Sequence, residues 1–299
     1  MERSLTEHTM QEFKACLQGA LLRPGNDSYE EARQVWNGMI DKRPALIVRC
    51  TGVADVINAV NFARDHDLLL AIRAGAHNVA GTAVCDGGIV IDLSSMKGIR
   101  VDPVPCTAHA QPGLLWGEFD HETQAFGLAT TGGIVTHTGI AGLMLGGGIG
   151  WLMRKPGLTC DNLLSADVVT ADGRFLRASE GEHADLFWGL RGGGGNFGIV
   201  TSFEYRLHPI RPLVLAGVLL HPAEHAQDVL RFYRDYIASV PDEVTTIVNL
   251  RKAPPAPFLP ESLHGLPVVI IAVCYAGPIS EGEQVLAPLR GFSQPIRPG

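Results

Sequence analysis

The sequence predicts an α+β protein in two parts, which meet near residue 212. In the first hundred residues, apolar runs and one amphipathic stripe follow the order strand, helix, strand, loop, strand. Beyond the proline-rich segment 208–212, the order becomes strand, helix, strand, strand, helix. The third observation is a glycine excess: the 35 glycines of this 299-residue chain cluster around residues 132–150 and 192–198. That clustering indicates loops that come close to other backbone or to a ligand.

Apolar periodicity and helix-capping signals define the elements of the first part, residues 1–212. Helices are expected at 6–22, 51–66, 113–126 and 182–190, and strands at 45–50, 68–73, 89–93, 106–110, 163–170, 173–178 and 199–207. Thr51 is the expected N-cap of the second helix, and Ser179 with Glu182 forms the expected capping box of the fourth. Residues 139–150 are too glycine-rich for a helix interior and too apolar for a surface loop. They are therefore expected to be buried backbone, either beside a large flat ligand or in close helix–strand packing.

The second part, residues 213–299, is expected to form an antiparallel sheet with helices. Strands are predicted at 213–220, 245–250 and 268–275, helices at 226–237 and 281–289, and a proline-rich connection at 254–267. This order is one strand short of a split βαβ unit, so the sheet is expected to expose an edge. We therefore expect either that the chain is shortened or that a partner supplies the missing strand.

Composition excludes several classes of function. The net charge is −7 and Lys and Arg form no block, which argues against a nucleic acid or an anionic membrane as partner. Neither a signal peptide nor an apolar run of membrane-spanning length is visible, so a cytoplasmic location is expected. The six cysteines are scattered without C-x-x-C spacing and H-E-x-x-H is absent. Reduced thiols and no metal site are therefore expected.

The segment Arg73–Gly81 is the candidate binding loop. It follows the apolar run 68–72 and holds one histidine, His77, among small residues. Small residues leave backbone N–H groups uncovered, and consecutive N–H groups can hold an anion. Taken alone, such a pattern is more often a turn with a hydrogen-bonded histidine than a binding site.

A Rossmann nucleotide-binding motif is rejected on its context. Gly193, Gly195 and Gly198 satisfy G-x-G-x-x-G, but the helix is expected before this motif and the strand after it. The Rossmann motif requires the opposite order, because the diphosphate lies at the N-terminus of the helix that follows. In the other candidate, 146–150, the third glycine position falls on Trp151.

Several stretches in a fixed order carry a family resemblance. They are 44–48, 73–77, 146–150 leading to 157–162, 167–173 and 195–200. Together they resemble the vanillyl-alcohol-oxidase-type flavoproteins with a PCMH-type FAD-binding domain, and within them the berberine-bridge-enzyme-like branch. The resemblance is close over residues 25–212 and looser beyond. It implies an FAD-binding domain of two α/β subdomains at 1–212 and a partial substrate domain at 213–299.

The resemblance implies a set of cofactor-binding residues. His77 would be joined to the 8α-methyl group of FAD. The diphosphate would be lined by Arg73, Gly75, Ala76, Asn78, Val79 and Gly81. The stretch beside the cofactor would be Thr138, Gly139, Gly142, Gly146, Gly147, Gly148, Ile149 and Gly150. The adenosine end would lie near Asn196, Gly198 and Val200. Some members of the family add a second link from a cysteine; Val135 occupies that position here, so a single covalent bond is expected, and Cys160 is expected to be a packing residue.

The general base is left unassigned by this resemblance. Relatives continue beyond this length and carry a catalytic tyrosine segment that nothing here matches. His137, in Val135–Thr138, is the titratable candidate beside the expected flavin. Tyr205, Tyr233 and Tyr275 lie on patterned elements and are expected in the core or at interfaces.

The leading hypothesis is an FAD-dependent oxidase. It would take a hydride from an alcohol or amine carbon of a sugar or secondary metabolite and pass electrons to O2. The alternatives are a flavin-binding module that does not turn over or needs a partner, and a structural protein without cofactor. A small-molecule substrate is the expected ligand, and homo-oligomer formation is left open.

Overall fold

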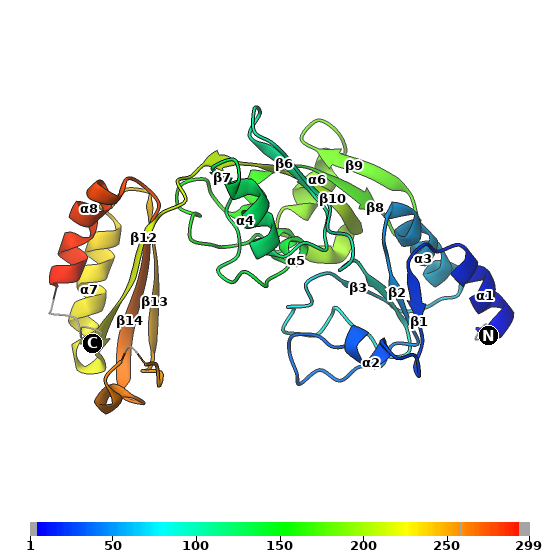
Figure 1. Cartoon of the computed structure of the whole chain (residues 1–299), viewed down its shortest axis with the longest axis horizontal. Helices are drawn as coiled ribbons and strands as arrows, with labels where there is room; N and C mark the ends of the chain where they lie inside the picture. Colours follow the sequence, from blue (N-terminus) through cyan, green and yellow to red (C-terminus); the bar gives the residue numbers. More distant parts are fainter. Residues whose placement is uncertain (1–4, 258, 293–299) are drawn as a thin grey trace. The chain divides into compact units, whose positions relative to one another are not determined.

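The computed structural model describes residues 5–257 and 259–292, and it confirms the α+β class. The chain forms two compact units (Figure 1). Unit 1 runs to residue 150 and resumes over 158–208; unit 2 contains 151–157 and the chain from 209 onward. The main boundary between the units therefore lies near residue 208. Residues 151–157 also belong to unit 2, although the residues on both sides of them belong to unit 1.

The first sheet of unit 1 is mostly parallel. Its order is β1-β2-β4-β3, with β1 antiparallel to β2, and with β2 and β3 both parallel to β4. The elements are α1 (Glu7–Ala15), β1 (Ala20–Leu22), α2 (Tyr29–Ala32), β2 (Leu46–Arg49), α3 (Val53–Asp65), β3 (Leu70–Arg73) and β4 (Ile89–Asp92). β4 is buried along its whole length, as expected for a parallel strand covered on both faces. α3 packs between β4 and β8 of the second sheet.

The second sheet of unit 1 is antiparallel, in the order β5-β6-β10-β8-β9. Its strands are β5 (Ile99–Asp102), β6 (Thr107–Ala110), β8 (Leu163–Val169), β9 (Phe175–Ser179) and β10 (Ile199–Arg206). The accompanying elements are α4 (Trp116–Gln124), β7 (Leu128–Ala129), α5 (Ile140–Leu145), η1 (Thr159–Asn162), α6 (Ala184–Leu190), η2 (Gly194–Phe197) and β11 (His208–Pro209), which pairs with β7. Trp116, Phe119, Phe203 and Tyr205 form the aromatic centre of this core.

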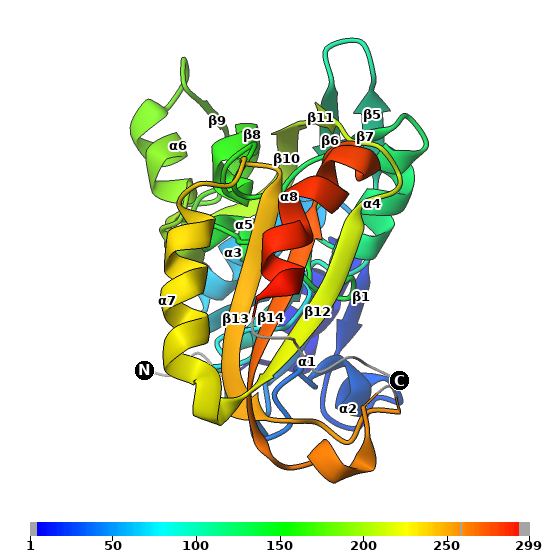
Figure 2. The ribbon, with the colours of Figure 1, turned by 90° about the vertical axis from the view of Figure 1, so that its left-hand side faces the viewer.

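Unit 2 is a three-stranded antiparallel sheet in the order β12-β14-β13. Its elements are β12 (Leu215–Pro222), η3 (Ala223–His225), α7 (Ala226–Ile237), β13 (Val244–Lys252), η4 (Glu261–Leu263), β14 (Pro267–Tyr275) and α8 (Ile279–Gly291). Figure 2 shows α7 and α8 on the same face of this sheet. The expected order of strands and helices is confirmed. One residue of the expected connection 254–267, Phe258, lies outside the described residues.

The excursion 151–157 belongs to unit 2 because its basic side chains bind there. Arg154 Nη1 donates to the carbonyl of Val244 (3.1 Å), and Lys155 Nζ lies 2.8 Å from Glu243 Oε1. Hydrogen bonding to Lys155 lowers the pKa of the Glu243 carboxyl below its ordinary value. Charge complementarity thus sets this part of the fold.

The helix expected at the N-terminal end was wrong in its second half. The helix expected over 6–22 ends at Ala15, and residues 20–22 form β1 instead. A Cβ at Gly19 would lie 1.8 Å from the carbonyl oxygen of Arg49, so the chain here approaches β2 too closely for a helix bearing side chains. Pairing with β2 therefore overrides the local helical pattern.

Both expected helix caps were also wrong. α3 begins after Gly52, and Thr51 instead donates its hydroxyl to Asp55 (3.0 Å). α6 begins after His183, whose φ of 49° is left-handed, and no side chain caps it. Ser179 and Glu182 bind each other through backbone groups rather than as a capping box. Neither helix therefore has a side-chain cap.

Of the three tyrosines expected in the core or at interfaces, two are confirmed in the core and Tyr233 is half-buried against the core of unit 2. Tyr205 is fully buried, Tyr275 is buried in the core of unit 2, and Tyr233 Oη lies 2.7 Å from Thr246 Oγ1. Burial raises the pKa of Tyr205 far above its ordinary value. Its hydroxyl has no hydrogen-bond partner among the described protein atoms.

The substitution Tyr205→Phe is accordingly expected to leave the free energy of unfolding unchanged or to raise it by up to about 1 kcal/mol, because it removes an unpaired buried hydroxyl. Tyr233→Phe, which loses a formed hydrogen bond, is expected to cost about 1 kcal/mol. Denaturant unfolding of both variants gives the comparison. A loss above about 1 kcal/mol for Tyr205→Phe would contradict the absence of a partner.

Candidate FAD-binding site

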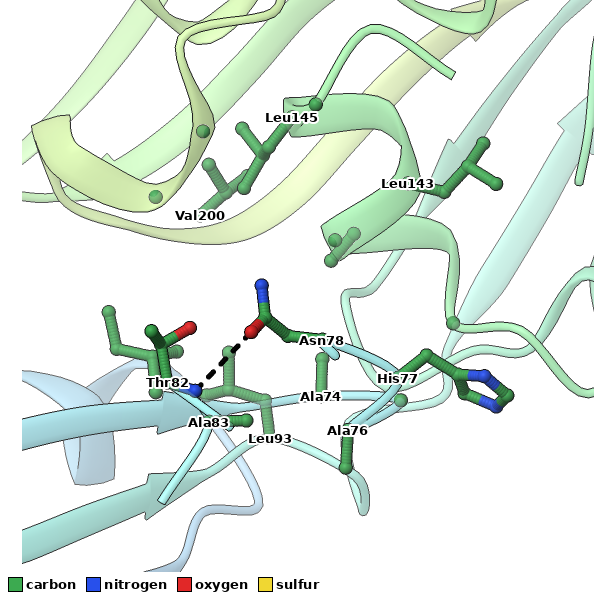
Figure 3. A pocket seen from close by; sticks show the side chains of 18 of the residues that line it. Ala74, Ala76, His77, Asn78, Thr82, Ala83, Leu93, Leu143, Leu145 and Val200 are labelled. Atoms are coloured by element: carbon green, nitrogen blue, oxygen red, sulfur yellow. Dashed lines mark hydrogen bonds between the residues drawn. The ribbon is translucent and has the colours of Figure 1, made fainter. Parts of the chain in front are cut away.

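Three segments far apart in sequence surround one cavity of unit 1, with a volume of about 450 Å³. The first is the loop that follows β3, the second runs from Thr138 through α5, and the third joins η2 to β10. In Figure 3, Asn78 and Thr82 lie on one side of this space, and Leu145 and Val200 lie on the other. The cavity therefore lies between the first sheet and α5.

The first two segments touch through backbone alone. A Cβ on Gly75 would lie 2.5 Å from both the Cα and the N of Gly139, and the reverse substitution gives 2.7 Å. Carbon atoms not bonded to one another do not approach this closely, so glycine is required at both positions. This contact closes one side of the cavity.

Two other lining glycines have the opposite environment. A Cβ at Gly142 or Gly195 would meet no protein atom within 4 Å. The space that a side chain would fill there is the cavity itself. These positions leave room for a bound molecule beside bare backbone.

No lining residue, among those that the structure describes, is Asp, Glu, Lys or Arg. Polar character comes from Asn78, Thr82, Thr138 and His77, together with backbone groups. Asn78 Oδ1 accepts the backbone N–H of Thr82 (3.3 Å), which closes the turn of the binding loop. An anion here would be held by backbone N–H dipoles, as phosphate is held in glycine-rich sites.

His77 contacts two aromatic rings. Its imidazole stacks on Trp36, with ring centroids 5.6 Å apart at 21°, and lies 4.9 Å from the ring of His137. Burial lowers the pKa of His77, nearby His137 lowers it further, and a hydrogen bond to the His137 backbone acts in the opposite direction. At neutral pH the ring is therefore neutral, with a nitrogen lone pair available. The preceding Ala76 has a left-handed φ of 55°, so the loop is strained beside this histidine.

Ten of the residues expected from the sequence line the cavity. They are Gly75, Ala76, His77, Asn78, Thr138, Gly139, Gly142, Gly146, Gly198 and Val200. The structure thus brings together residues from all three expected regions. Their contact with a cofactor stays a prediction.

The remaining expected residues do not line the cavity. They are Arg73, Val79, Gly81, Gly147, Gly148, Ile149, Gly150 and Asn196. Arg73 turns its guanidinium toward α2, where Nη1 donates to the carbonyls of Ala32 and Gln34. Gly81 is left-handed and packs against Ile40. Asn196 binds the carbonyl of Gly193 (3.0 Å).

The glycine run 146–150 has a packing role in its second half. A Cβ at Gly148 would lie 2.3 Å from Thr159 Oγ1, and one at Gly150 would lie 1.8 Å from the carbonyl oxygen of Gly132. Close packing therefore applies to the second half of 139–150, whereas residues of the first half line the cavity and their contact with a ligand stays a prediction. Contrary to expectation, Ile140–Leu145 forms a short helix, because its apolar face is buried in the core.

Sequence reasoning missed eleven lining residues. They are Ile72, Ala74, Thr82, Ala83, Leu93, Ala141, Leu143, Leu145, Gly194, Gly195 and Ile199. Several are immediate neighbours of expected residues and could have been found by extending each motif. Leu93 could not, because only the parallel pairing of β3 with β4 brings it beneath the loop.

Three further expectations concern positions near this site. His137 is exposed and does not line the cavity, so its role as a base stays a prediction. Val135 is 45% exposed and supplies a carbonyl to the turn before Thr138. Cys160 is buried in the core of unit 1, which confirms it as a packing residue, and burial raises the pKa of its thiol.

Comparison with known proteins now identifies the family. The family model for an FAD binding domain matches residues 44–179, which include the binding loop and α5. In sequence and fold the chain is similar to PCMH-type flavoproteins of the berberine-bridge-enzyme-like group. An FAD-linked oxidoreductase of Dictyostelium discoideum is 34% identical over 288 residues, which are 95% of this chain and 60% of the relative. The (R)-6-hydroxynicotine oxidase of Paenarthrobacter nicotinovorans is 33% identical over 282 residues, 94% of this chain and 60% of the relative.

Solved structures of the flavoprotein family agree with the fold. The BBE-like 1 protein of Physcomitrella patens has a TM-score of 0.86 at 25% identity, covering 96% of this chain and 61% of that protein. A chitooligosaccharide oxidase has a TM-score of 0.81 at 26% identity, covering 93% and 58%. These matches include unit 2, which the sequence motifs covered only loosely. The chain spans about 60% of the length of the relatives it matches.

FAD fits the residues of this cavity. Bare backbone at Gly142 and Gly195 leaves room for a flat ring or a diphosphate, and the charge-free lining suits binding through backbone N–H groups. Among the described residues, no three or more of His, Cys, Asp and Glu are placed to bind a metal ion. Within the same ranges, no helix is long and apolar enough to cross a bilayer.

Proposed function

We propose that the chain binds FAD in this cavity through a single covalent bond to His77 and serves an oxidase that acts on a small molecule. The observation that carries the proposal is the cavity itself, in which the histidine-bearing loop, α5 and the glycine-rich segment before β10 converge. When bound, FAD supplies a ring that accepts two electrons from a substrate carbon and passes them to O2. The named activities of the relatives support an oxidase.

The residues of the chain would divide the work of holding FAD. The loop from Gly75 to Thr82 offers backbone N–H groups and the Asn78 amide to the diphosphate. Leu143, Leu145 and Val200 offer apolar surface that excludes water from a flat ring. His77, neutral because burial lowers its pKa, offers the ring nitrogen for attachment. By the family resemblance, Val135 occupies the position at which some members carry a second attachment residue, so one bond is proposed.

The substrate is proposed to be an alcohol or amine whose carbon is oxidised. One relative is named as an oxidase of 6-hydroxynicotine, a cyclic amine, and a solved structure as an oxidase of chitooligosaccharides, which are sugars. Both substrates present a carbon bearing nitrogen or oxygen beside a removable hydrogen. Cyclic amines and oligosaccharides are therefore the two substrate classes to test. A substrate should bleach the flavin absorbance, which should return when the sample is reoxidised in air.

The decisive prediction is acid-stable flavin on the wild-type chain and none on His77→Ala. After acid denaturation, the wild type should stay yellow and gain the mass of FAD, because a covalent bond survives unfolding. His121→Ala serves as the matched control: it removes a histidine that is 84% exposed and does not line the cavity, so flavin should still be bound covalently. Colourless acid-treated wild type, or undiminished attachment in His77→Ala, would refute the covalent proposal.

A further inference from the structure

The segment 32–42, between α2 and β2, is docked along the binding loop. Its contacts are hydrogen bonds from Trp36 N to Ala76 O (3.0 Å), from Asn37 Nδ2 to Val79 O (2.8 Å), and from Lys42 Nζ to Gly81 O (3.0 Å) and Val84 O (3.2 Å). The segment is itself closed at its base, where Arg33 Nη1 lies 2.5 Å from Asp41 Oδ1. Ion pairing with Arg33 lowers the pKa of Asp41, so this closure holds at neutral pH. The segment and the binding loop therefore form one unit of structure.

Trp36 is the point at which this segment reaches His77. Its side chain is 61% exposed, so burial in the core does not fix its position. Its backbone N–H is anchored on Ala76, the residue before His77, and its indole lies nearly parallel to the imidazole. The ring of His137 contacts the same imidazole at a tilt of 43°. An aromatic pair at this distance contributes attraction beyond simple burial.

From this arrangement we infer that Trp36 is a positioning residue, whose indole holds the His77 imidazole against His137 in the orientation from which a ring nitrogen can bond to the flavin. The inference rests on the proposed attachment at His77. An unsupported imidazole in a loop would sample several rotamers, and only a subset would aim the nitrogen at the cofactor. Stacking on Trp36 and contact with His137 together restrict this choice.

The chemistry that depends on this orientation is the formation of one N–C bond. His77 loses the hydrogen on its ring nitrogen, and the 8α carbon loses one hydrogen. The two protons and two electrons released pass to the flavin ring and from it to O2, which becomes H2O2. O2 is the oxidant that the proposed function already requires. Trp36 takes no part in this balance and affects only the orientation of the nitrogen.

The first test measures attachment. Full-length chain is produced without flavin, mixed with FAD in air, and sampled for acid-stable flavin over time. In Trp36→Ala the rate should fall about tenfold, equivalent to about 1.4 kcal/mol and within the range of an aromatic pair, while reversible FAD binding is retained. Trp36→Phe, which keeps a ring, should recover most of the rate. Met39→Ala, a substitution at a 90% exposed site of the same segment, should attach flavin like the wild type.

The second test needs no flavin and separates this inference from the proposed function. Ring protons of His77 are assigned by NMR from the difference between wild type and His77→Ala. In Trp36→Ala their shifts should move as the ring current of the indole is lost, and the pKa of His77 should rise toward its ordinary value as the imidazole becomes exposed. Thermal melts show that each variant is folded.

The outcomes are distinguishable. If the wild type carries no acid-stable flavin, the covalent proposal falls, and the NMR comparison still decides whether Trp36 positions His77. If the His77 resonances and pKa are the same in Trp36→Ala as in the wild type, the inference is overturned whatever the flavin result. Wild-type attachment rates in a folded Trp36→Ala would overturn it as well.

Discussion

Gly139→Ala is expected to weaken FAD binding at least about tenfold and to lower the free energy of unfolding by about 1–3 kcal/mol. The added Cβ would lie 2.7 Å from the Cα and N of Gly75. Both are backbone atoms, which cannot rotate away as a side chain would, so the two segments must separate. Since both line the cavity, its shape changes with them. Titration of flavin fluorescence and denaturant unfolding measure the two effects.

A matched control separates this contact from the general effect of replacing glycine. Gly139 has φ −69° and ψ 140°, which alanine adopts freely, so backbone strain does not contribute. Gly142→Ala, three residues later in α5, adds a Cβ with no protein atom within 4 Å. It is expected to preserve stability or raise it by about 0.5–1 kcal/mol, because alanine favours helix. Equal stability of Gly139→Ala and wild type would contradict the backbone contact.

Asp55→Ala is expected to lower the free energy of unfolding by about 3 kcal/mol, because four part-buried hydrogen bonds lose a charged acceptor. The Asp55 carboxylate is 2% exposed. It accepts the backbone N–H groups of Gln18 (2.8 Å), Gly19 (3.1 Å) and Thr51 (2.9 Å) and the hydroxyl of Thr51 (3.0 Å). It thereby ties the turn before β1 and the end of β2 to the first turn of α3. The corresponding fall in melting temperature is roughly 6–12 °C.

Asp65→Ala is the control on the same helix. Its carboxylate is 58% exposed and pairs with Arg64 at the surface, so its removal should change stability by less than about 0.5 kcal/mol. Thermal and denaturant unfolding of both variants gives the comparison. Similar losses for the two aspartates would refute the special role of Asp55.

The pH dependence of Asp55 has a definite sign. Burial raises its pKa, but hydrogen bonds from Thr51, Gln18 and Gly19 outweigh burial, so its folded pKa lies below the ordinary value. Its contribution to stability is therefore complete above the unfolded pKa of about 3.9 and is lost as pH falls through the lower folded value. Asp55→Asn should show a shallower loss of stability below about pH 4 than the wild type. An unchanged slope would contradict the hydrogen-bonded carboxylate.

Elements with strong local patterns were predictable. Apolar runs defined β2, β3 and β4, and the apolar stripe of α3 placed that helix correctly. Elements that depend on distant partners were not: β1 forms only because β2 offers an edge, and β5 only because it pairs with β6. The order of elements around the rejected Rossmann motif was also predicted correctly: α6 precedes Gly193 and β10 follows Gly198.

By itself the sequence determined the family, the FAD-binding character of the first part and the loop with His77 at its centre, because these depend on residue types in a fixed order. Only the tertiary structure decided which of those residues face the cavity. Arg73 and Gly148 belong to family motifs, yet Arg73 binds the carbonyl of Gln34 and Gly148 packs against Thr159. Leu93 belongs to no motif but lines the cavity. Trp36 stacks on His77, although the two residues are far apart in sequence, because the loops that carry them pack together. The direction of a side chain follows from contacts between distant segments, and a linear pattern does not contain them.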